Sequence, residues 1–346
     1  MRESVTYDDM LLVPQYSTIE SRTEVDLSQQ LADSPSIILG IPIISSPMDT
    51  VTGVDMALAM NQCGGIGIIH RYNTIEEQAH MVDQAGLAPW AHEHTRAAAI
   101  GVTGDFEERA AALYAAGARV LCIDVAHGHH ILVKRALKML KDTYGKEVHL
   151  MAGNVATVEA FNDLADWGAD SIRCGIGGGS ICTTRIQTGH GVPGLTTIFE
   201  CAKSDRDAKI IADGGIKTSG DIVKALAAGA DFVMLGSLVA GTAETPGQLL
   251  SYTDGSKRKA YRGMASKKAQ KEWRGAAGTP EGIATTIHYK GSVRDVVKDL
   301  VGGIKSGCSY SGASSLAELR TSARWHRQTG ASMAESSPHI LGRPNG

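Results

Sequence analysis

The sequence predicts an α/β protein folded as a (β/α)8 TIM barrel, and three observations predict this fold. Short apolar runs rich in Val and Ile recur eight times, longer amphipathic segments lie between them, and polar or glycine residues follow the runs directly. Continuous apolar strands that alternate with helices are typical of parallel sheets buried on both faces. Eight regularly spaced units favour closure of such a sheet into a barrel, whose active sites lie at the carboxyl ends of the strands.

The predicted elements follow one another in a regular order. The strands are expected at Ile41–Ser46, Gly65–Ile69, Ala98–Val102, Val120–Val125, His149–Val155, Ser171–Ile176, Lys209–Gly214 and Phe232–Gly236. Helices are expected between them, for example at Asp105–Ala116, Ile131–Thr143, Thr157–Trp167 and Ser219–Ala228. An open doubly wound sheet shares this alternation, but no GxGxxG turn follows the first strand, which weighs against a dinucleotide-binding Rossmann domain.

The 346 residues fit a single barrel domain over 1–346, because such barrels commonly run from about 200 to over 400 residues. Residues 1–40 precede the first strand and are expected to cap the barrel or lie over it. A mobile active-site flap is predicted at about 249–291, where turn residues, a basic run and a Gly-rich stretch follow the last strand. Residues 304–326 are expected to be helical, and the tail 336–346 to be extended.

Composition excludes several classes of partner. The 37 acidic and 34 basic residues leave a net charge of −3, which provides no electrostatic footprint for nucleic acid. No apolar run reaches the ~18 residues of a membrane span, and the N-terminus lacks the pattern of a signal peptide. We therefore expect a cytoplasmic protein. Its six cysteines show no CxxC spacing and are expected to be mostly reduced core residues.

The glycine-rich stretch 175–185 is the most informative motif. Its glycines permit backbone conformations in which amide and carbonyl groups converge on an ion or ligand. Cys182 lies in this stretch, just after a predicted strand, and Thr183, Thr184 and Arg185 provide hydroxyl and cationic neighbours for a thiolate. A lone cysteine is more often an inert core residue. In this position we interpret Cys182 as a nucleophile.

Two further turns predict a phosphate site. Asp213-Gly-Gly follows the seventh strand and Leu235-Gly-Ser follows the eighth, where barrels often bind phosphate. Gly-Gly pairs alone are usually only turns, but the position of these favours phosphate binding. Ser180, Gly215 and Ser237 would supply donors, and Asp213 would hold a ribose diol.

Three histidines, His127, His129 and His130, raise a metal hypothesis. No acidic partner stands at HExxH spacing, and histidines on a strand-to-helix turn are more often solvated or hydrogen-bonded. The pattern therefore disfavours zinc. Asp124, at the end of the fourth strand, is the stronger functional candidate.

Together these residues resemble the IMP dehydrogenase/GMP reductase family over nearly the whole chain. The matching stretches are TYDDMLLVP (6–14), PIISSPMDTVT (42–52), GGIGIIHR (64–71), IDVAHGH (123–129), GNVAT (153–157), GIGGGSICTTR (175–185), IIADGGI (210–216), VMLGS (233–237), YRGM (261–264) and PEG (280–282). So many matching stretches in the same order are specific for this family. The resemblance implies a homotetrameric barrel that binds a purine nucleoside monophosphate next to a nicotinamide.

The resemblance also implies roles for single residues. Cys182 would attack purine C2, Thr184 would assist the leaving or attacking group, and Glu281 would contact the base edge around N1. Nucleotide contacts are implied for Ser46, Met48, Ser180, Asp213, Gly215, Gly236, Ser237, Tyr261, Gly263 and Met264. The nicotinamide side would involve Asp124, Val125, Ala126, Asn154 and Arg173. Backbone carbonyls of Gly175, Gly177 and Cys182 match the family's monovalent-cation site, which takes K+ in some members.

The two branches of the family differ in how the covalent adduct on cysteine is resolved. Dehydrogenases hydrolyse it with an Arg-Tyr pair on a long flap, whereas residues 265–279 are short here and contain Trp273-Arg274 but no Arg-Tyr. The regulatory CBS insertion of most dehydrogenases is missing between strands two and three, and Thr188-Gly189 and Glu200-Cys-Ala fit the reductase. SSPMD, His-Arg at 70–71, PEG and the ESSPH tail are closer to the dehydrogenase.

The absence of an Arg-Tyr pair that could activate water decides between the branches, because hydrolysis of the adduct requires such a base. The sequence therefore predicts a GMP reductase that uses NADPH to convert GMP to IMP and ammonia. The alternative is an IMP dehydrogenase without CBS domains, which would use NAD and activate water with Arg274 or another flap group. A third alternative, a nucleotide-binding protein without catalysis, is disfavoured by the intact Cys182 and Thr184.

Overall fold

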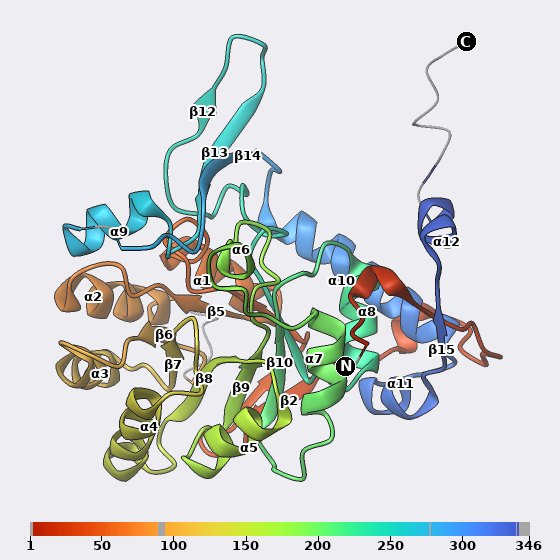
Figure 1. Cartoon of the computed structure of the whole chain (residues 1–346), viewed down its shortest axis with the longest axis horizontal. Coiled ribbons are helices and arrows are strands. Elements are labelled where there is room, and N and C mark those ends of the chain that lie inside the picture. The colour runs from red at the N-terminus through yellow and green to blue at the C-terminus, as the bar shows by residue number, and fades with distance from the viewer. Residues whose placement is uncertain (1–2, 89–93, 277, 337, 339–346) are drawn as a thin grey trace.

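The computed structural model describes residues 3–88, 94–276, 278–336 and 338, and within them eight parallel strands form a closed barrel (Figure 1). Neighbouring strands follow the order β10-β11-β4-β5-β6-β7-β8-β9. Their bounds are β4 Ile43–Ser45, β5 Ile66–Ile69, β6 Ala97–Ile100, β7 Val120–Asp124, β8 His149–Val155, β9 Ser171–Cys174, β10 Lys209–Asp213 and β11 Phe232–Leu235. The predicted fold class is confirmed, and each barrel strand lies within a predicted run or starts one residue before it.

Helices follow the barrel strands and surround them. They are α1 Val54–Gln62, α2 Ile75–Gly86, α3 Phe106–Ala115, α4 Ile131–Tyr144, α5 Val158–Asp166, α6 Thr184–Thr188, α7 Gly194–Cys201, α8 Ser219–Ala227 and α10 Val293–Tyr310. Hydroxyl side chains begin several of them: Thr74, Thr157 and Thr218 each accept a hydrogen bond from a backbone N–H of the first turn. Among the described residues, none of the helices is both long and apolar enough for a membrane span.

Side chains along each strand alternate between the barrel interior and the surrounding helices. The interior contains Ile44, Ile66, Ile68, Ala97, Ala99, Val120, Cys122, Met151, Ile211, Phe232 and Met234. The same apolar cluster includes Leu31, Ala32, Ile37 and Leu39 from the antiparallel pair β2 Gln29–Ala32 and β3 Ile37–Leu39. This hairpin thus packs against the barrel interior, as expected for a cap formed by residues 1–40.

The upper level of the interior is polar. Gly153 on β8 pairs with both Asp124 and Arg173, so these two side chains lie at one level of the barrel. Arg173 also pairs with Ile211, which places Asp213 one inward position further along β10. The alternation that fills the lower interior with apolar side chains therefore places three charges directly beneath the barrel mouth.

Residues 304–326 do not form the single helical stretch that was predicted. α10 ends at Tyr310, Gly312 adopts a φ of +65°, and α11 (Leu316–Ser322) starts anew from the cap residue Ser315. β15 (Trp325–Arg327) then pairs with β1 (Met10–Leu12) near the N-terminus. The helical expectation was wrong there because a strand partner more than 300 residues away leaves no local pattern.

The predicted flap segment, 249–291, lies between β11 and α10. It contains a three-stranded antiparallel sheet of β12 Leu250–Ser251, β13 Lys257–Arg262 and β14 Ala284–His288, together with α9 Lys267–Arg274. Figure 1 shows β12 and β13 projecting from the barrel and α9 beside α2. The remaining described elements are the short 3-10 helices Tyr7–Asp9 and Arg22–Glu24, and α12 Gly330–Glu335. Most of the tail predicted to be extended lies outside the described residues.

Candidate active site

A cavity of about 330 Å³ opens at the carboxyl ends of the barrel strands. All predicted site residues line it, from the strand-end loops and from the flap segment: Ser46, Met48, Asp124, Val125, Ala126, Asn154, Arg173, Gly175, Gly177, Ser180, Cys182, Thr184, Asp213, Gly215, Gly236, Ser237, Tyr261, Gly263, Met264 and Glu281. The carboxyl ends of parallel strands converge on one face of a barrel, which explains why positions far apart in the sequence share one cavity.

The loop after β9 is shaped by glycine. Gly175 has a φ of +153°, and a Cβ there would lie 1.9 Å from the carbonyl oxygen of Asp213, so only glycine fits. The loop also pairs with the flap segment: Ile283 donates its N–H to Ile181 O at 3.0 Å, and Thr183 donates to Glu281 O at 2.9 Å. These bonds hold the cysteine loop against the segment that carries Glu281.

Three side chains form a chain of hydrogen bonds across this junction. The thiol of Cys182 donates to Thr184 Oγ1 at 3.2 Å, and that hydroxyl donates to Glu281 Oε2 at 2.8 Å. All three residues are partly buried. We call Cys182, Thr184 and Glu281 the relay, because this direction of donation leads a proton from sulfur to a carboxylate.

The opposite wall combines close backbone approach with hydroxyl groups. Ser46 Oγ is buried and has no hydrogen-bond partner among the described residues, so a polar group in the cavity would satisfy it. A Cβ at Gly236 would lie 3.2 Å from the Tyr261 hydroxyl and 3.3 Å from Ser46 Oγ. The hydroxyl oxygen of Tyr261 lies 3.3 Å from Ser180 Oγ. Burial raises the pKa of Tyr261, so its hydroxyl keeps its proton.

Charged groups form the floor of the cavity. Arg173 donates to Asp124 Oδ1 at 2.6 Å and, through two nitrogens, to Asp213 Oδ2 at 2.9 and 3.1 Å. Burial opposes the guanidinium charge, but Asp213 and Asp124 outweigh it and hold the pKa of Arg173 well above its ordinary value. Asn154 also donates to Asp213 Oδ2, at 2.8 Å. Arg173 therefore positions the two aspartates from inside the barrel.

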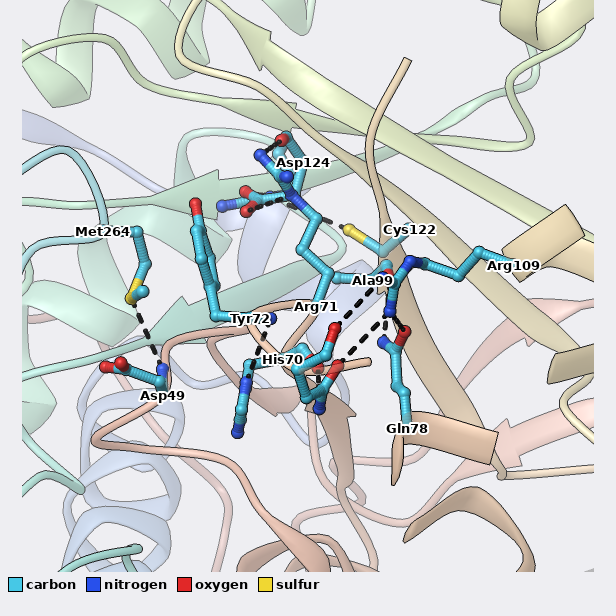
Figure 2. A network of polar contacts seen from close by, with 12 residues as sticks. Asp49, His70, Arg71, Tyr72, Gln78, Ala99, Arg109, Cys122, Asp124 and Met264 are labelled. Carbon is cyan, nitrogen blue, oxygen red and sulfur yellow. Dashed lines mark hydrogen bonds and ion pairs between the residues drawn. The ribbon is translucent and has the colours of Figure 1, made fainter. Parts of the chain in front are cut away.

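Several cavity residues were not predicted to belong to the site, among them the polar side chains of Arg71, Tyr72 and Gln270. Arg71 donates from Nη2 to the backbone oxygen of Asp124 at 3.1 Å, and its guanidinium lies 4.9 Å from the ring centre of Tyr72. Figure 2 shows Arg71 reaching toward Asp124. Arg71 and Tyr72 follow the end of β5, so the argument that placed Asp124 and Asp213 at the site, their position at the carboxyl end of a barrel strand, would have found them as well.

The histidine cluster serves other contacts. His129 Nε2 lies 2.7 Å from Asp163, and its ring stacks near Trp167 with centroids 5.8 Å apart. His130 accepts the N–H of Leu132 at the start of α4. Within the described part of the chain, no group of three or more His, Cys, Asp or Glu side chains is arranged to hold a metal ion.

The predicted cation ligands are backbone carbonyls of the same glycine loop. Gly177 has a φ of +82°, and the carbonyl oxygen of Gly175 accepts from Asn154 Nδ2 at 2.9 Å. A carbonyl has two lone pairs, so this bond leaves Gly175 able to accept a second partner. The hard oxygen donors of Gly175, Gly177 and Cys182 are of the kind that suits an alkali-metal ion.

Comparisons with known proteins agree on one family. The model described as "IMP dehydrogenase / GMP reductase domain" matches residues 4–339. Inosine-5′-monophosphate dehydrogenases of Nitrosopumilus maritimus and Staphylococcus aureus are 34% and 36% identical over 98% of this chain and 98% and 96% of their own lengths. A structure of GMP reductase from Trypanosoma brucei, a cysteine-to-alanine variant in complex with guanosine 5′-monophosphate, superposes with a TM-score of 0.91 at 33% identity, covering 98% of both chains.

Proposed function

Because this chain belongs to the IMP dehydrogenase/GMP reductase family, whose members are NAD(P)-dependent oxidoreductases acting on purine nucleoside monophosphates, we propose that it is a GMP reductase. The proposed reaction is the NADPH-dependent conversion of GMP to IMP and ammonia. The sulfur of Cys182 adds to purine C2, the amino group leaves as ammonia, and a hydride then replaces the sulfur at C2. The cofactor supplies this hydride when bound.

The relay gives each step a proton path. Thr184 Oγ1 lies between Cys182 Sγ and Glu281 Oε2, so Glu281 takes the thiol proton and returns it to the departing amine. A proton is needed there because an amide ion is a poor leaving group. After hydride addition the C2–S bond breaks and the sulfur leaves as a thiolate, and one proton taken up from solvent through Glu281 and Thr184 restores the thiol.

The cavity walls fit the two ligands proposed for them. Ser46, Ser180, Gly215 and Ser237 lie on the wall assigned to the nucleotide, where the unpartnered hydroxyl of Ser46 calls for a polar ligand group. The contacts of Asp213 with Arg173 and Asn154 all use Oδ2, which leaves Oδ1 for a ribose hydroxyl. The nicotinamide is assigned to the wall of Asp124, Val125, Ala126 and Asn154, with Arg173 beneath it.

One observation favours the reductase over the dehydrogenase: residues 265–279 contain no Arg-Tyr pair to activate water. Trp273 instead donates its indole N–H to Asp49 Oδ2 at 3.3 Å, which ties α9 to the barrel. The side chain of Arg274, the substitute base considered for a dehydrogenase, lies outside the described residues. The relatives align over 472 and 475 positions, more than this chain has residues, in keeping with the missing insertion between β5 and β6.

The second candidate is an IMP dehydrogenase that converts IMP, NAD and water to XMP and NADH. The identities of 34% and 36% to two dehydrogenases favour it, as do SSPMD and PEG in the sequence. Both candidates use the relay. They differ in whether water or hydride reaches the adduct.

Absorbance at the reduced-nicotinamide band distinguishes these functions. With purified enzyme, GMP and NADPH we expect oxidation of NADPH with formation of one IMP and one ammonia per turnover. NADH formation from IMP and NAD, without NADPH oxidation by GMP, would assign the dehydrogenase. Calorimetric binding of GMP or IMP without either turnover would assign a binding protein. Parallel assays with NADH test the choice of NADPH.

Three further properties belong to the proposal: a homotetramer, a cytoplasmic location and activation by K+. Gel filtration with light scattering measures the assembly, and fractionation of cells measures the location. Replacing KCl by N-methylglucamine chloride at constant ionic strength tests the carbonyls of Gly175, Gly177 and Cys182. A rate that rises with K+ supports the cation site, and a constant rate contradicts it.

A further inference from the structure

Asp49 forms an ion-pair centre just outside the catalytic cavity. Arg262 donates from Nε to Asp49 Oδ1 and Oδ2 at 3.2 and 2.9 Å, and also from Nη2 to Oδ2. Trp273 donates to the same carboxylate. The backbone N–H of Asp49 contacts Met264 Sδ at 3.4 Å (Figure 2). The Asp49 side chain is only 6% exposed. It does not line the catalytic cavity but a second one, of about 480 Å³, beside α2 and α9.

This centre fastens the flap segment to the barrel. Asp49 belongs to the loop after β4, whereas Arg262 ends β13 and Trp273 lies on α9. The backbone N–H of Arg262 also donates to Thr50 Oγ1 at 3.2 Å. Arg262 is 12% exposed at its side chain, so its pair with Asp49 is largely shielded from water and strongly dependent on its geometry.

A short path leads from Arg262 to the relay. Gly263, the next residue, donates to Ile283 O at 2.9 Å, and Glu281 donates its N–H to Ala265 O at 3.1 Å. Glu281 itself and Ile283, two residues further on, are thus bonded to the segment that directly follows Arg262. Glu281 O in turn accepts from Thr183 at 2.9 Å. Movement of the anchored strand end would move the Glu281 carboxylate relative to Thr184.

We propose that Asp49 is a positioning residue that holds the relay in place through Arg262. This inference rests on the proposed chemistry at Cys182, but it applies equally to the reductase and the dehydrogenase. Asp49 touches no reacting atom. Its effect is on the distance between Glu281 and Thr184, and hence on removal of the thiol proton.

Glu272 provides a matched control within the same cluster. It is the second carboxylate on Arg262, but its side chain is 46% exposed and lies at the solvent side of α9. An exposed ion pair contributes little because water screens it. Glu272→Gln should therefore leave the relay unchanged, whereas Asp49→Asn removes the charge that Arg262 depends on.

The experiment measures alkylation of Cys182 by iodoacetamide in the full-length protein, followed by mass spectrometry of its peptide. Asp49→Asn and Glu281→Gln should each slow alkylation about 10-fold, and Glu272→Gln less than about 2-fold. The double variant Asp49→Asn/Glu281→Gln should be slowed no further than Glu281→Gln alone. Multiplication of the two effects, or no slowing by Asp49→Asn, would overturn the proposal.

A second variant guards against general loss of structure. Arg262→Lys keeps the charge but loses the two-pronged contact, so alkylation should slow by an intermediate factor of about 3. In the steady state, Asp49→Asn should lower kcat about 10-fold and change KM for the nucleotide less than about 3-fold. A rise in KM with constant kcat would contradict a role in the relay. The alkylation results stand whether or not GMP proves to be the substrate.

Discussion

The two ends of this barrel differ in what fills them. At the carboxyl end, Arg173, Asp124 and Asp213 occupy the interior, and glycine loops surround an open cavity. At the other end, the β2–β3 hairpin adds Leu31 and Leu39 to an apolar cluster without charged members. Polar groups that are placed to bind a ligand add little to the stability of the fold, so the packed apolar end contributes more of it. Chemistry and stability are therefore expected to respond to mutations at opposite ends.

Cys182→Ala at the open end should have the largest effect. Without the sulfur no covalent adduct can form, so turnover should fall at least about 10⁴-fold, or roughly 5.5 kcal/mol. Binding of the nucleotide should change less than about 3-fold, because the groups proposed to hold its phosphate are not altered. Steady-state assay and calorimetry measure the two. Cys63→Ala is the control, because the thiol of Cys63 is half-buried and lies outside the cavity. Turnover that is retained in Cys182→Ala would contradict the role of Cys182 as the nucleophile.

Leu39→Ala at the closed end should affect stability instead. Leu39 is 2% exposed, and truncation of such a side chain leaves a cavity that costs about 3 to 4 kcal/mol. Chemical denaturation measures the loss, while kcat at 25 °C should stay within about 2-fold. Ile38 on the same strand is 63% exposed, so Ile38→Ala should cost less than about 0.5 kcal/mol. A large fall in kcat for Leu39→Ala would show that the two ends are coupled.

His149 makes the closed end sensitive to acid. It lies at the start of β8, and burial lowers its pKa to about 4. The unfolded chain binds a proton at this histidine near pH 6.5, whereas the folded chain does so only near pH 4. The contribution of His149 to the free energy of unfolding is therefore fully present above about pH 6.5 and is lost as the pH falls toward 4. Between pH 7 and pH 5 we expect a loss of about 2 kcal/mol from this group.

Denaturation curves at the two pH values, compared between the native protein and His149→Gln, isolate this contribution. The variant should lose about 2 kcal/mol less over the same interval. An equal loss in both proteins would assign the acid sensitivity elsewhere. Arg173 at the open end, whose pKa is raised well above its ordinary value, should stay charged throughout the interval.

Ser46→Ala should have the smallest effect, confined to the open end. Its hydroxyl has no partner among the described residues, so its removal should weaken GMP binding about 5-fold, or about 1 kcal/mol, without loss of stability. Ser45 is the matched control, because it accepts a bond from Thr52 Oγ1 at 2.9 Å inside the protein. Ser45→Ala should lower stability but not affinity, and the reverse pattern would exclude Ser46 as a ligand contact.

Much of the site could be predicted from the sequence, because the position of a residue directly after a strand can be read from its neighbours in the chain. Each apolar run marks a strand, and residues just after parallel strands meet at one face of a barrel. Cys182, Asp124 and Asp213 could be placed at the cavity in this way. The assignment of Glu281 to the site came from the family resemblance, since it follows no barrel strand. Arg71 and Tyr72 were missed although the same rule covers them.

The sequence by itself determined the barrel, the glycine turns and most of the side chains that follow the barrel strands at its mouth, since these depend on periodicity and on residue type. Only the tertiary structure decided which of them touch. The bond from Thr184 to Glu281 spans 97 positions, and the pair of Asp49 with Arg262 spans 213. Such contacts depend on strand register and on the path of the flap segment, and neither leaves a periodic trace in the chain.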